Sequence, residues 1–427
     1  MTAIVTPSGP SLAMLDELFG SNLRRVGFRL WDGTPWPDDR SRDATIVLRH
    51  PGALRQMFAA GTEKALAEAY LRDDFDIEGD IEAAFELSDL LSGRDEGWWT
   101  NLRTYFHLRR LPAMRGESES ARMFGERDDR QHTVPRDRQA VSFHYDVSND
   151  FYRLWLDERM VYSCAYFERP EMSLDEAQEA KLRHICRKLR LAPGQRLLDI
   201  GCGWGGLSLY AARHHGVTVT GVTLSREQAR LATERARAAG LQDRVTIELR
   251  DYRELNPARM FDAIVSVGMS EHVGRTHLPA YFRRAAQLLR PGGVFLNHAI
   301  GDGVRQRLRA GPSFIEAYVF PDSDIPPIPI VLQAAEGAGF EVRDVENLRE
   351  HYARTLRHWV SRLEAAHEDA LEFVNEPTYR VWRLYMAGSA YGFAHGALAV
   401  YQALLVKPDA DGVAHLPPTR HDWYPAA

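Results

Sequence analysis

The chain is 427 residues long, which is more than one compact hydrophobic core usually holds and predicts two or three domains. Hydrophobic residues make up 44% and charged residues 26% of the sequence, a composition typical of globular proteins. The formal net charge is −6 at pH 7, so no broad positive field is available to attract nucleic acid.

The cysteines and the amino terminus bear on the cellular compartment. Only Cys164, Cys186 and Cys202 occur, and their spacing fits neither a C-x-x-C metal site nor a secreted disulfide framework. The first twenty residues lack the basic and long apolar regions of a signal peptide, and no segment approaches the roughly 18 consecutive apolar residues of a spanning helix. We therefore expect a cytoplasmic protein.

The amino-terminal part of the chain predicts a small α+β domain. Residues 26–33 and 44–50 have the alternation of strands, and residues 61–75 have the periodicity of a helix. The highly charged stretch 116–140 has almost no apolar runs, which is typical of a linker. We predict an N-terminal domain over 1–115, a linker over 116–140 and a larger C-terminal domain over 141–427.

From about residue 141 onward, short β-branched or aliphatic segments alternate with helical patterns such as that of residues 224–240. We expect strands over 196–200, 217–222, 245–249, 261–267 and 293–299, with a last strand within 396–406. Strand–helix alternation predicts a parallel, doubly wound α/β sheet. A proline-rich insertion after Gly301 fits neither a helix nor a central strand.

A glycine-rich turn, DIGCGWGG (199–206), follows the first predicted strand. Gly201 and Gly203 permit a sharp turn and close approach of the backbone to a ligand, and the following helix N-terminus favours negative charge. Gly206 also satisfies the third glycine of the dinucleotide fingerprint, which leaves a nicotinamide cofactor as an alternative.

The end of the second predicted strand argues against a dinucleotide. The acid expected there is replaced by Thr223-Leu224-Ser225, with Gln228 one turn into the next helix. LLDIGCGWGG instead resembles the glycine motif of S-adenosylmethionine-dependent methyltransferases, in which the acid ending the first strand, here Asp199, orients the methionine part of the cofactor. Arg250-Asp251-Tyr252 resembles their adenine-recognition turn, where a carboxylate takes the exocyclic amine and an aromatic ring covers the base. The resemblance implies a class I methyltransferase (Rossmann-like) fold.

Seven segments in order resemble the cyclopropane-fatty-acyl-phospholipid synthase family, whose motifs the mycolic-acid cyclopropane synthases share. They are FHYDVSNDFYRLWLDERMVYSCAYF (143–167), LLDIGCGWGGLSLYAA (197–212), GVTLSREQ (221–228), SVGMSEHVG (266–274), LNHAIG (296–301), AYVFPDSDIPP (317–327) and HYARTLRHW (351–359). The N-terminal region resembles the extra domain of the long family members, which act on phospholipid. A homodimer is implied by those members.

The resemblance also implies a reaction. An alkene in an unsaturated phospholipid acyl chain takes the methyl of S-adenosylmethionine and becomes a carbocation, and loss of a proton from the new methyl closes a cyclopropane ring. In the family a bound bicarbonate ion is the base. Its pocket residues match Cys164, Glu271, His298, Ile300 and Tyr352 here. By resemblance, Glu271 accepts a hydrogen bond from the bicarbonate and relays its proton, His298 and Tyr352 donate, and Cys164 and the Ile300 backbone close the pocket.

Each of these side chains has an ordinary structural alternative. Glu271 alone suits a helix N-cap or a helix-dipole partner, and His298 alone suits a satisfied structural histidine. Cys164 alone suits a small buried hydrophobe, and Tyr352 alone suits a core aromatic residue.

A carbocation needs stabilisation without water, and aromatic faces supply it by cation–π attraction. The candidates are Phe143, Tyr145, Tyr166, Phe167 and Tyr318, with Tyr145 the first choice from the family match. Tyr162-Ser163 is expected to contact the methionine end of the cofactor, as in the resembling enzymes. Many members carry a cysteine in the late helix where this chain has Ser389, and proton abstraction by an anion needs no thiol there.

A protein acting on lipid chains is expected to associate peripherally with the inner face of the membrane. Residues 101–116, NLRTYFHLRRLPAMRG, mix aromatic residues with arginines and are the candidate contact; a solvated helix with a linker is the alternative. Two further functions stay open: methylation or methylenation of the alkene to a branched chain, and a lipid-binding or dinucleotide-dependent protein without methyl transfer.

Overall fold

The computed structural model describes residues 8–20, 22–92, 108–111, 148–305, 314–319 and 324–424. These residues form two compact units. The first contains the described residues up to 111 together with 314–319 and 375–391, and the second contains 148–305, 324–374 and 392–424. The boundaries expected at 115 and 140 lie outside the described residues, so the predicted domain division stays a prediction.

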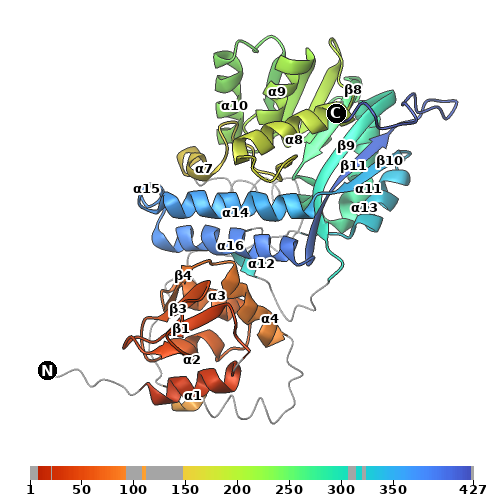
Figure 1. Ribbon diagram of the computed structural model, residues 1–427. Coiled ribbons are helices and arrows are strands. Elements are labelled where there is room, and N and C mark those ends of the chain that lie inside the picture. The colour runs from red at the N-terminus through yellow and green to blue at the C-terminus, as the bar shows by residue number, and fades with distance from the viewer. Residues whose placement is uncertain are drawn as a thin grey trace. The chain divides into compact units, whose positions relative to one another are not determined.

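The first unit contains a four-stranded sheet in the order β2-β1-β3-β4 (Figure 1). Its strands are β1 (Val26–Arg29), β2 (Pro35–Trp36), β3 (Ala44–Leu48) and β4 (Phe75–Gly79). Its helices are α1 (Gly9–Leu18), α2 (Ala53–Phe58), α3 (Glu63–Leu71), α4 (Glu86–Ser92), α12 (Phe314–Tyr318) and most of α16 (Glu376–Ala394), with a 3-10 turn at Ala83–Phe85. The strands expected within 26–33 and 44–50 and the helix expected within 61–75 are confirmed.

Ion pairing explains why residues of α16 belong to this first unit. The Arg380 guanidinium is buried, donates to the Tyr70 carbonyl at 2.9 Å and pairs with Asp73 at 2.8 Å. Arg383 donates to the Tyr70 hydroxyl at 2.8 Å. A buried arginine is stable only when its donors are satisfied, so these contacts hold α16 against α3 and β4.

The second unit contains a seven-stranded sheet in the order β10-β11-β9-β8-β5-β6-β7. The strands are β5 (Arg196–Ile200), β6 (Thr218–Thr223), β7 (Val245–Leu249), β8 (Phe261–Val267), β9 (Leu289–Asp302), β10 (Glu341–Asn347) and β11 (Leu398–Val406). Five neighbouring strands of the sheet, β9, β8, β5, β6 and β7, are parallel, as expected. The strand β11 runs antiparallel to both β9 and β10. The fold is that of class I methyltransferases.

The six predicted strands of this unit are confirmed, and β10 is the strand that the sequence did not indicate. Its sequence is EVRDVEN, and only Asp344 in it is buried. An edge strand with one covered face needs no continuous apolar run, so its pattern is weak.

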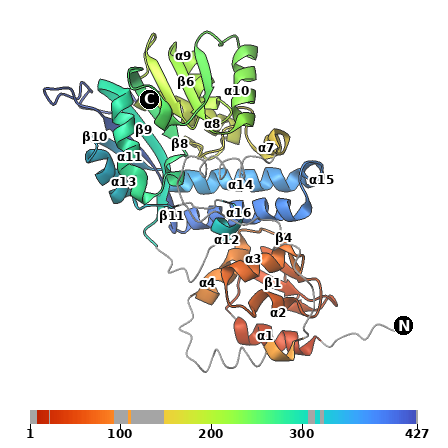
Figure 2. The ribbon, with the colours of Figure 1, turned by 180° about the vertical axis from the view of Figure 1, so that it is seen from behind.

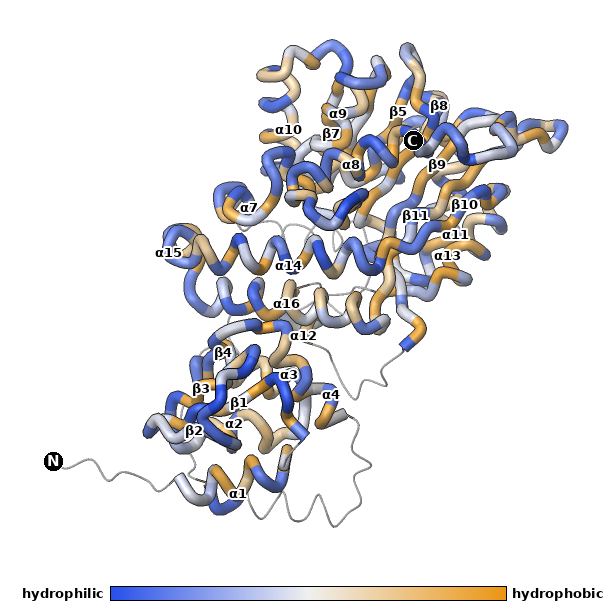
Figure 3. Tube along the Cα trace, in the orientation of Figure 1, coloured by the Kyte–Doolittle hydropathy of each residue, from blue (hydrophilic) through white to orange (hydrophobic). Residues whose placement is uncertain are grey.

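The central strands are buried on both faces, which gives them their continuous apolar sequences. Leu197, Val265, Leu296 and Leu404 face one core, and their chain neighbours Leu198, Ile264, Phe295 and Leu405 face the other. Figure 3 shows the resulting hydrophobic strands between helices with mixed faces. This two-sided packing fixes the strand ends that carry the site.

Helices cover both faces of the sheet (Figures 1 and 2). Residues of α8 (Leu174–Lys188), α9 (Gly206–His215) and α10 (Arg226–Ala238) pack into the first core, and residues of α11 (Leu278–Leu288) and α13 (Ile328–Glu336) pack into the second. The unit also contains α7 (Asn149–Trp155), α14 (Arg349–Ala365) and α15 (His367–Ala370). Among the described residues, no helix combines the length and apolar character needed to cross a membrane.

Side-chain caps fix where two of these helices begin. Ser173 and Glu176 form a reciprocal capping box at the start of α8, and Ser225 accepts from the Gln228 amide at the start of α10. Such caps satisfy backbone donors that lack partners within the helix. The helix expected over 224–240 is confirmed as α10.

Truncating a side chain of the two-sided core is expected to destabilise the fold. Leu296→Ala removes a fully buried side chain from β9, and we expect a loss of about 2–5 kcal/mol in the free energy of unfolding, measured by urea denaturation. Val304→Ala is the control, because Val304 is 98% exposed. Equal stabilities of the two variants would contradict the assignment of Leu296 to the core.

Candidate active site

The glycine-rich turn between β5 and α9 forms one wall of a pocket at the carboxyl ends of the parallel strands. Gly201 and Gly203 have φ values of +78° and +54°, in the left-handed region that favours glycine. The amides of Gly201 and Cys202 both donate to the Val222 carbonyl, at 2.9 and 3.0 Å. The turn is thereby tied to the end of β6, and its glycines lie in the pocket wall as expected.

Asp199 is the last residue but one of β5, lies in this wall and is buried. Its Oδ2 accepts a hydrogen bond from Ser208 Oγ at 2.7 Å. Burial raises the pKa of Asp199 to about 6, so its carboxylate is poised to gain stability from a cationic ligand group. This fits the expected contact with the methionine part of a cofactor.

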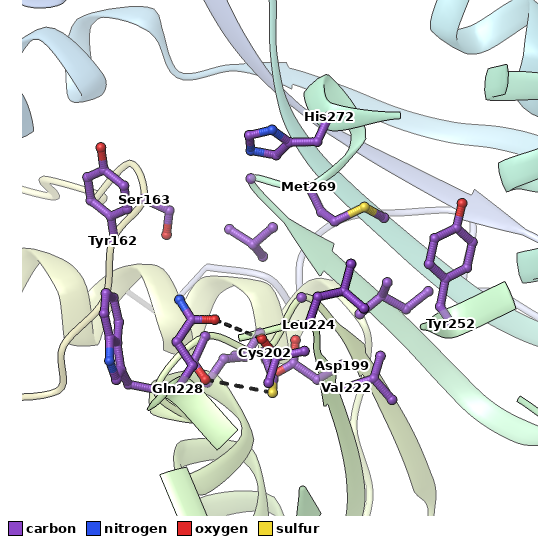
Figure 4. Close-up of a pocket in the computed structure, with 18 of the residues that line it drawn as sticks. Tyr162, Ser163, Asp199, Cys202, Val222, Leu224, Gln228, Tyr252, Met269 and His272 are labelled. Atoms are coloured by element: carbon purple, nitrogen blue, oxygen red, sulfur yellow. Dashed lines mark hydrogen bonds between the residues drawn. The ribbon is translucent and has the colours of Figure 1, made fainter. Parts of the chain in front are cut away.

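The end of β6 supplies hydroxyl and amide groups in place of an acid. Thr223, Leu224 and Gln228 all line the pocket. Thr223 Oγ1 donates to Gln228 Oε1 at 2.8 Å and accepts from the Ser225 amide at 3.2 Å. These bonds fix the Gln228 amide within the pocket wall, where Figure 4 shows this side chain.

The turn after β7 brings Asp251 and Tyr252 into the same wall, as the sequence predicts. Arg253, which the sequence did not single out, also lines the pocket and pairs with Asp251, with Nη2 at 2.6 Å from Oδ2. The Tyr252 ring packs edge-on against Tyr281, with centroids 5.6 Å apart. Tyr252 is thereby held as a fixed aromatic wall for a flat ring.

The opposite end of the pocket is formed by Tyr162 and Ser163, from the segment between α7 and α8. Figure 4 shows these two side chains on one side of the open centre and Tyr252 on the other. Tyr162 and Ser163 therefore lie across the pocket from Tyr252.

Several lining residues were not assigned from the sequence. They include Met160, Val161, Lys181, Cys202, Trp204, Met269 and His272. Met269 and His272 lie in the segment that follows β8, so the rule that strand ends face the ligand would have indicated this segment. Lys181 lies within α8, far in sequence from any strand end, and gave no local signal.

Glu271 lies in a short 3-10 helix, Ser270–His272, immediately after β8. Its Oε1 accepts a hydrogen bond from the Ile300 amide at 3.3 Å, which joins two of the predicted residues. Oε2 is buried and has no hydrogen-bond partner among the described residues. Burial raises the pKa of Glu271 to about 7.

His298 lies on β9, on the same face as Ile300 because side chains alternate along a strand. Its Nδ1 is 3.2 Å from Nε2 of Gln402 on β11, directly across the antiparallel ladder. Its Nε2 is buried and has no hydrogen-bond partner among the residues that the structure describes. Burial lowers the pKa of His298 to about 3, so the ring is neutral.

Cys164 and Tyr352 are joined through the start of α14. The Cys164 thiol is fully buried and donates to the carbonyls of Ala165 and Leu348, at 3.2 and 3.7 Å. The Tyr352 amide donates to the same Leu348 carbonyl at 3.0 Å. Burial raises the pKa of the Cys164 thiol, so it is a neutral donor and not a thiolate nucleophile.

Cys164, Glu271 and His298 are not in the pocket wall themselves, but each is next to or hydrogen-bonded to a residue of the wall. Cys164 follows Ser163 of the wall, Glu271 precedes His272 of the wall, and the His298 carbonyl accepts from the Gly268 amide at 2.9 Å. The roles expected for the five residues remain predictions.

Of the five aromatic residues expected to stabilise a carbocation, three lie within the described residues. Tyr145, the first choice, and Phe143 lie outside the described residues. Tyr166 stacks between His184 and His351, with centroids 4.4 and 4.8 Å apart, and Phe167 stacks on His358. Tyr318 belongs to the first unit and donates to Glu68. These three described rings are not part of the pocket wall.

The β5–α9 glycine turn, the buried Asp199 and the Asp251-Tyr252 turn surround one pocket on a seven-stranded sheet. Together they define an S-adenosylmethionine-dependent methyltransferase.

Comparison with known proteins identifies the family. The family model for mycolic acid cyclopropane synthetase matches residues 132–403. A probable fatty acid methyltransferase of Pseudomonas putida is 42% identical over 417 residues, which cover 97% of this chain and 100% of the relative. The cyclopropane-fatty-acyl-phospholipid synthase of Escherichia coli K12 is 40% identical over 270 residues, 63% of this chain and 68% of the relative.

Among solved structures, the mycolic acid cyclopropane synthase CmaA1 complexed with SAH and CTAB matches with a TM-score of 0.60 and 36% identity, over 63% of this chain and 97% of that chain. This chain belongs to the mycolic acid cyclopropane synthetase family. The resemblance inferred from the sequence motifs is thereby confirmed, and S-adenosylmethionine is favoured over the nicotinamide alternative.

The pKa of Glu271 gives a prediction for stability. Because the pKa is raised from 4.5 to about 7, the folded protein favours the protonated acid, and stability is lost as pH rises from about 4.5 through 7. Because glutamine carries no charge, we expect the free energy of unfolding of Glu271→Gln to exceed that of the wild type by up to about 3 kcal/mol at the upper end of this pH range. The measurement is urea denaturation at several pH values. Glu234→Gln, at a half-exposed site on α10, is the control. Parallel profiles of wild type and Glu271→Gln would contradict the buried state of this carboxyl.

Proposed function

We propose that the protein transfers a methyl group from S-adenosylmethionine to the double bond of an unsaturated phospholipid acyl chain and forms a cyclopropane ring, with bound bicarbonate as the base. The observation that carries the proposal concerns two buried atoms, Glu271 Oε2 and His298 Nε2. Neither atom has a hydrogen-bond partner among the described residues. Buried polar atoms without partners are costly, so this pair suits a small polar ligand.

The chemistry of the two groups fits hydrogen carbonate, which carries both acceptor oxygens and one O–H donor. A neutral imidazole has a single N–H, and the contact with Gln402 decides which nitrogen carries it. When the Gln402 amide donates to Nδ1, the proton lies on Nε2, and His298 can donate to an anion. Glu271 Oε2 can accept the O–H of the same ion. Bicarbonate, when bound, supplies a base that does not compete as a carbon nucleophile.

Glu271 is suited to pass a proton onward. A carboxyl with a pKa of about 7 exchanges protons in both directions near neutral pH, whereas an ordinary glutamate would hold the proton too weakly. The Ile300 amide bonded to Oε1 leaves Oε2 as the atom that receives the proton.

The cofactor pocket provides the other half of the chemistry. S-adenosylmethionine, when bound, supplies an electrophilic methyl on a sulfonium. Tyr252 and Asp251 are suited to hold its adenine, and Asp199 and the Tyr162-Ser163 segment its methionine part.

A continuous series of aromatic rings leads away from the pocket wall and supports an apolar acyl substrate. Trp204 contacts Tyr152 at a centroid distance of 4.9 Å, and Tyr152 contacts Tyr162 at 5.9 Å. Tyr162 contacts Trp359 at 5.2 Å, and Trp359 contacts Tyr352 at 6.0 Å. Rings of this kind exclude water and offer cation–π stabilisation to a carbocation without acting as nucleophiles.

A second outcome of the same chemistry is methylation or methylenation to a branched chain. A relative from Pseudomonas putida that matches over its whole length bears the name probable fatty acid methyltransferase, which favours this alternative. Both outcomes share the carbocation and differ in which proton leaves. Analysis of lipid products by mass spectrometry and NMR, after incubation with labelled S-adenosylmethionine and monounsaturated phospholipid, separates them; we expect the cyclopropane.

Access to phospholipid implies peripheral association with the inner face of the membrane. Of the candidate segment 101–116, only 108–111 lie within the described residues, so its membrane contact remains a proposal, as does a homodimer.

Glu271→Gln tests the relay. Because the amide cannot take up a proton, we expect turnover to fall by about 10²–10⁴-fold, while the affinity for S-adenosylhomocysteine stays unchanged. Turnover is measured with labelled S-adenosylmethionine and affinity by calorimetry. Loss of cofactor affinity in this variant would refute the relay role.

Ser389→Ala tests whether the late helix supplies a catalytic group. Ser389 is buried in α16 and lies outside the pocket wall, so we expect unchanged turnover in the same assay. A loss comparable to that of Glu271→Gln would show that a hydroxyl or thiol is required at this position.

A further inference from the structure

Helix α8 carries two buried lysines on one face. Lys181 and Lys188 are seven residues apart, which is close to two helical turns, and their exposed fractions are 1% and 0%. Burial of a lysine is rare and normally requires a charged partner. The two residues differ in this respect.

Lys188 has the expected partners. Its Nζ lies 2.5 Å from Glu346 Oε2 and 3.3 Å from Asp344 Oδ2. Lys181 Nζ donates instead to a neutral acceptor, Ser163 Oγ, at 2.9 Å. Within the described residues, no ion pair joins Lys181 to a carboxylate. An ammonium group has three donors, and Lys181 has one neutral acceptor for them, whereas Lys188 has two carboxylate partners that balance its charge.

The two lysines also differ in what they face. Lys181 lines the cofactor pocket together with Ser163 and Asp199, whereas Lys188 is not part of its wall. Burial lowers the pKa of Lys181 to about 8, with Asp157 and Asp199 offsetting the effect from a distance. A buried cation that faces a pocket and lacks an ion pair is suited to an anionic ligand group.

The cofactor carries a single anionic group, the carboxylate of its methionine part; its amine and its sulfonium are cationic. Asp199 lines the same pocket and interacts electrostatically with Lys181, and its carboxylate suits the amine. We propose that Lys181 Nζ binds the methionine carboxylate of S-adenosylmethionine, while Ser163 Oγ holds the ammonium in place. This inference rests on the cofactor of the family and not on the bicarbonate or on the product.

The proposal predicts a loss of affinity that depends on the ligand carboxylate. Lys181→Met is compared with wild type by calorimetry in bicarbonate-free buffer, using S-adenosylhomocysteine, which has the carboxylate, and 5′-methylthioadenosine, which lacks the amino acid. We expect roughly a 10- to 100-fold loss for S-adenosylhomocysteine and unchanged affinity for 5′-methylthioadenosine. Decarboxylated S-adenosylmethionine, which keeps the amine, is expected to bind the variant at least as tightly as wild type.

Equal losses for all three ligands would overturn the proposal, because they would mean that Lys181 only supports the Ser163 segment. A second outcome would also overturn the proposal: a loss of affinity for S-adenosylhomocysteine that appears only when bicarbonate is added. It would mean that the Lys181 ammonium group binds bicarbonate and not the cofactor carboxylate. Lys181→Gln retains a donor for Ser163 and removes the charge, so it should show the same selective loss if Lys181→Met does not fold.

Lys188→Met is the matched control on the same helix. It leaves Glu346 and Asp344 without their buried lysine, so we expect a lower midpoint of thermal unfolding and no change in the affinity ratio of the ligands. A selective loss in this variant would contradict the distinction between the two lysines.

The wild-type protein offers an independent test. At pH 8.5 much of Lys181 is deprotonated, and a bound carboxylate favours the charged form, so binding of S-adenosylhomocysteine should take up protons. Calorimetry in buffers of different ionisation enthalpy measures this uptake. We expect it for S-adenosylhomocysteine and not for 5′-methylthioadenosine; equal uptake for both, or none, would contradict the proposal.

Discussion

The parallel hydrogen bonding of β5 with β6 and β8 is the constraint on which the site depends. It brings the carboxyl ends of these strands to one edge of the sheet, although residues 199, 223 and 267 are far apart in the chain. Two hydrophobic cores, one on each face, hold the strands in register. The glycine turn, the Thr223–Gln228 pair and the segment around Glu271 therefore meet at this edge, where the Gly201 and Cys202 amides also donate to the Val222 carbonyl.

This rigid edge allows polar groups to remain buried at some energetic cost. Asp199 and Glu271 both have raised pKa values, and the His298 pKa is lowered, in each case because burial disfavours the charged form. Ordinary core positions would avoid such groups. Their concentration around one pocket is typical of a site whose polar partners arrive with the ligands.

The site divides the chemistry between two neighbouring sets of residues. The pocket wall from Ser163 to Tyr252 suits a nucleoside with an amino-acid tail, and beside it Glu271 Oε2 and His298 Nε2 are buried without a hydrogen-bond partner among the described residues. A series of aromatic ring contacts runs from Trp204 in the pocket wall, through Tyr162, to Tyr352.

The sequence by itself determined the family, the parallel strands and part of the pocket wall, because apolar runs, glycine turns and strand-end residues are local patterns. It did not indicate β10, whose charged residues suit an edge strand, or Arg253, whose pairing with Asp251 is a side-chain geometry. Only the tertiary structure distinguished Lys181 from Lys188 and placed Gln402 against His298. Those facts depend on which atoms meet across helices and strands, and no local pattern in the chain encodes such meetings.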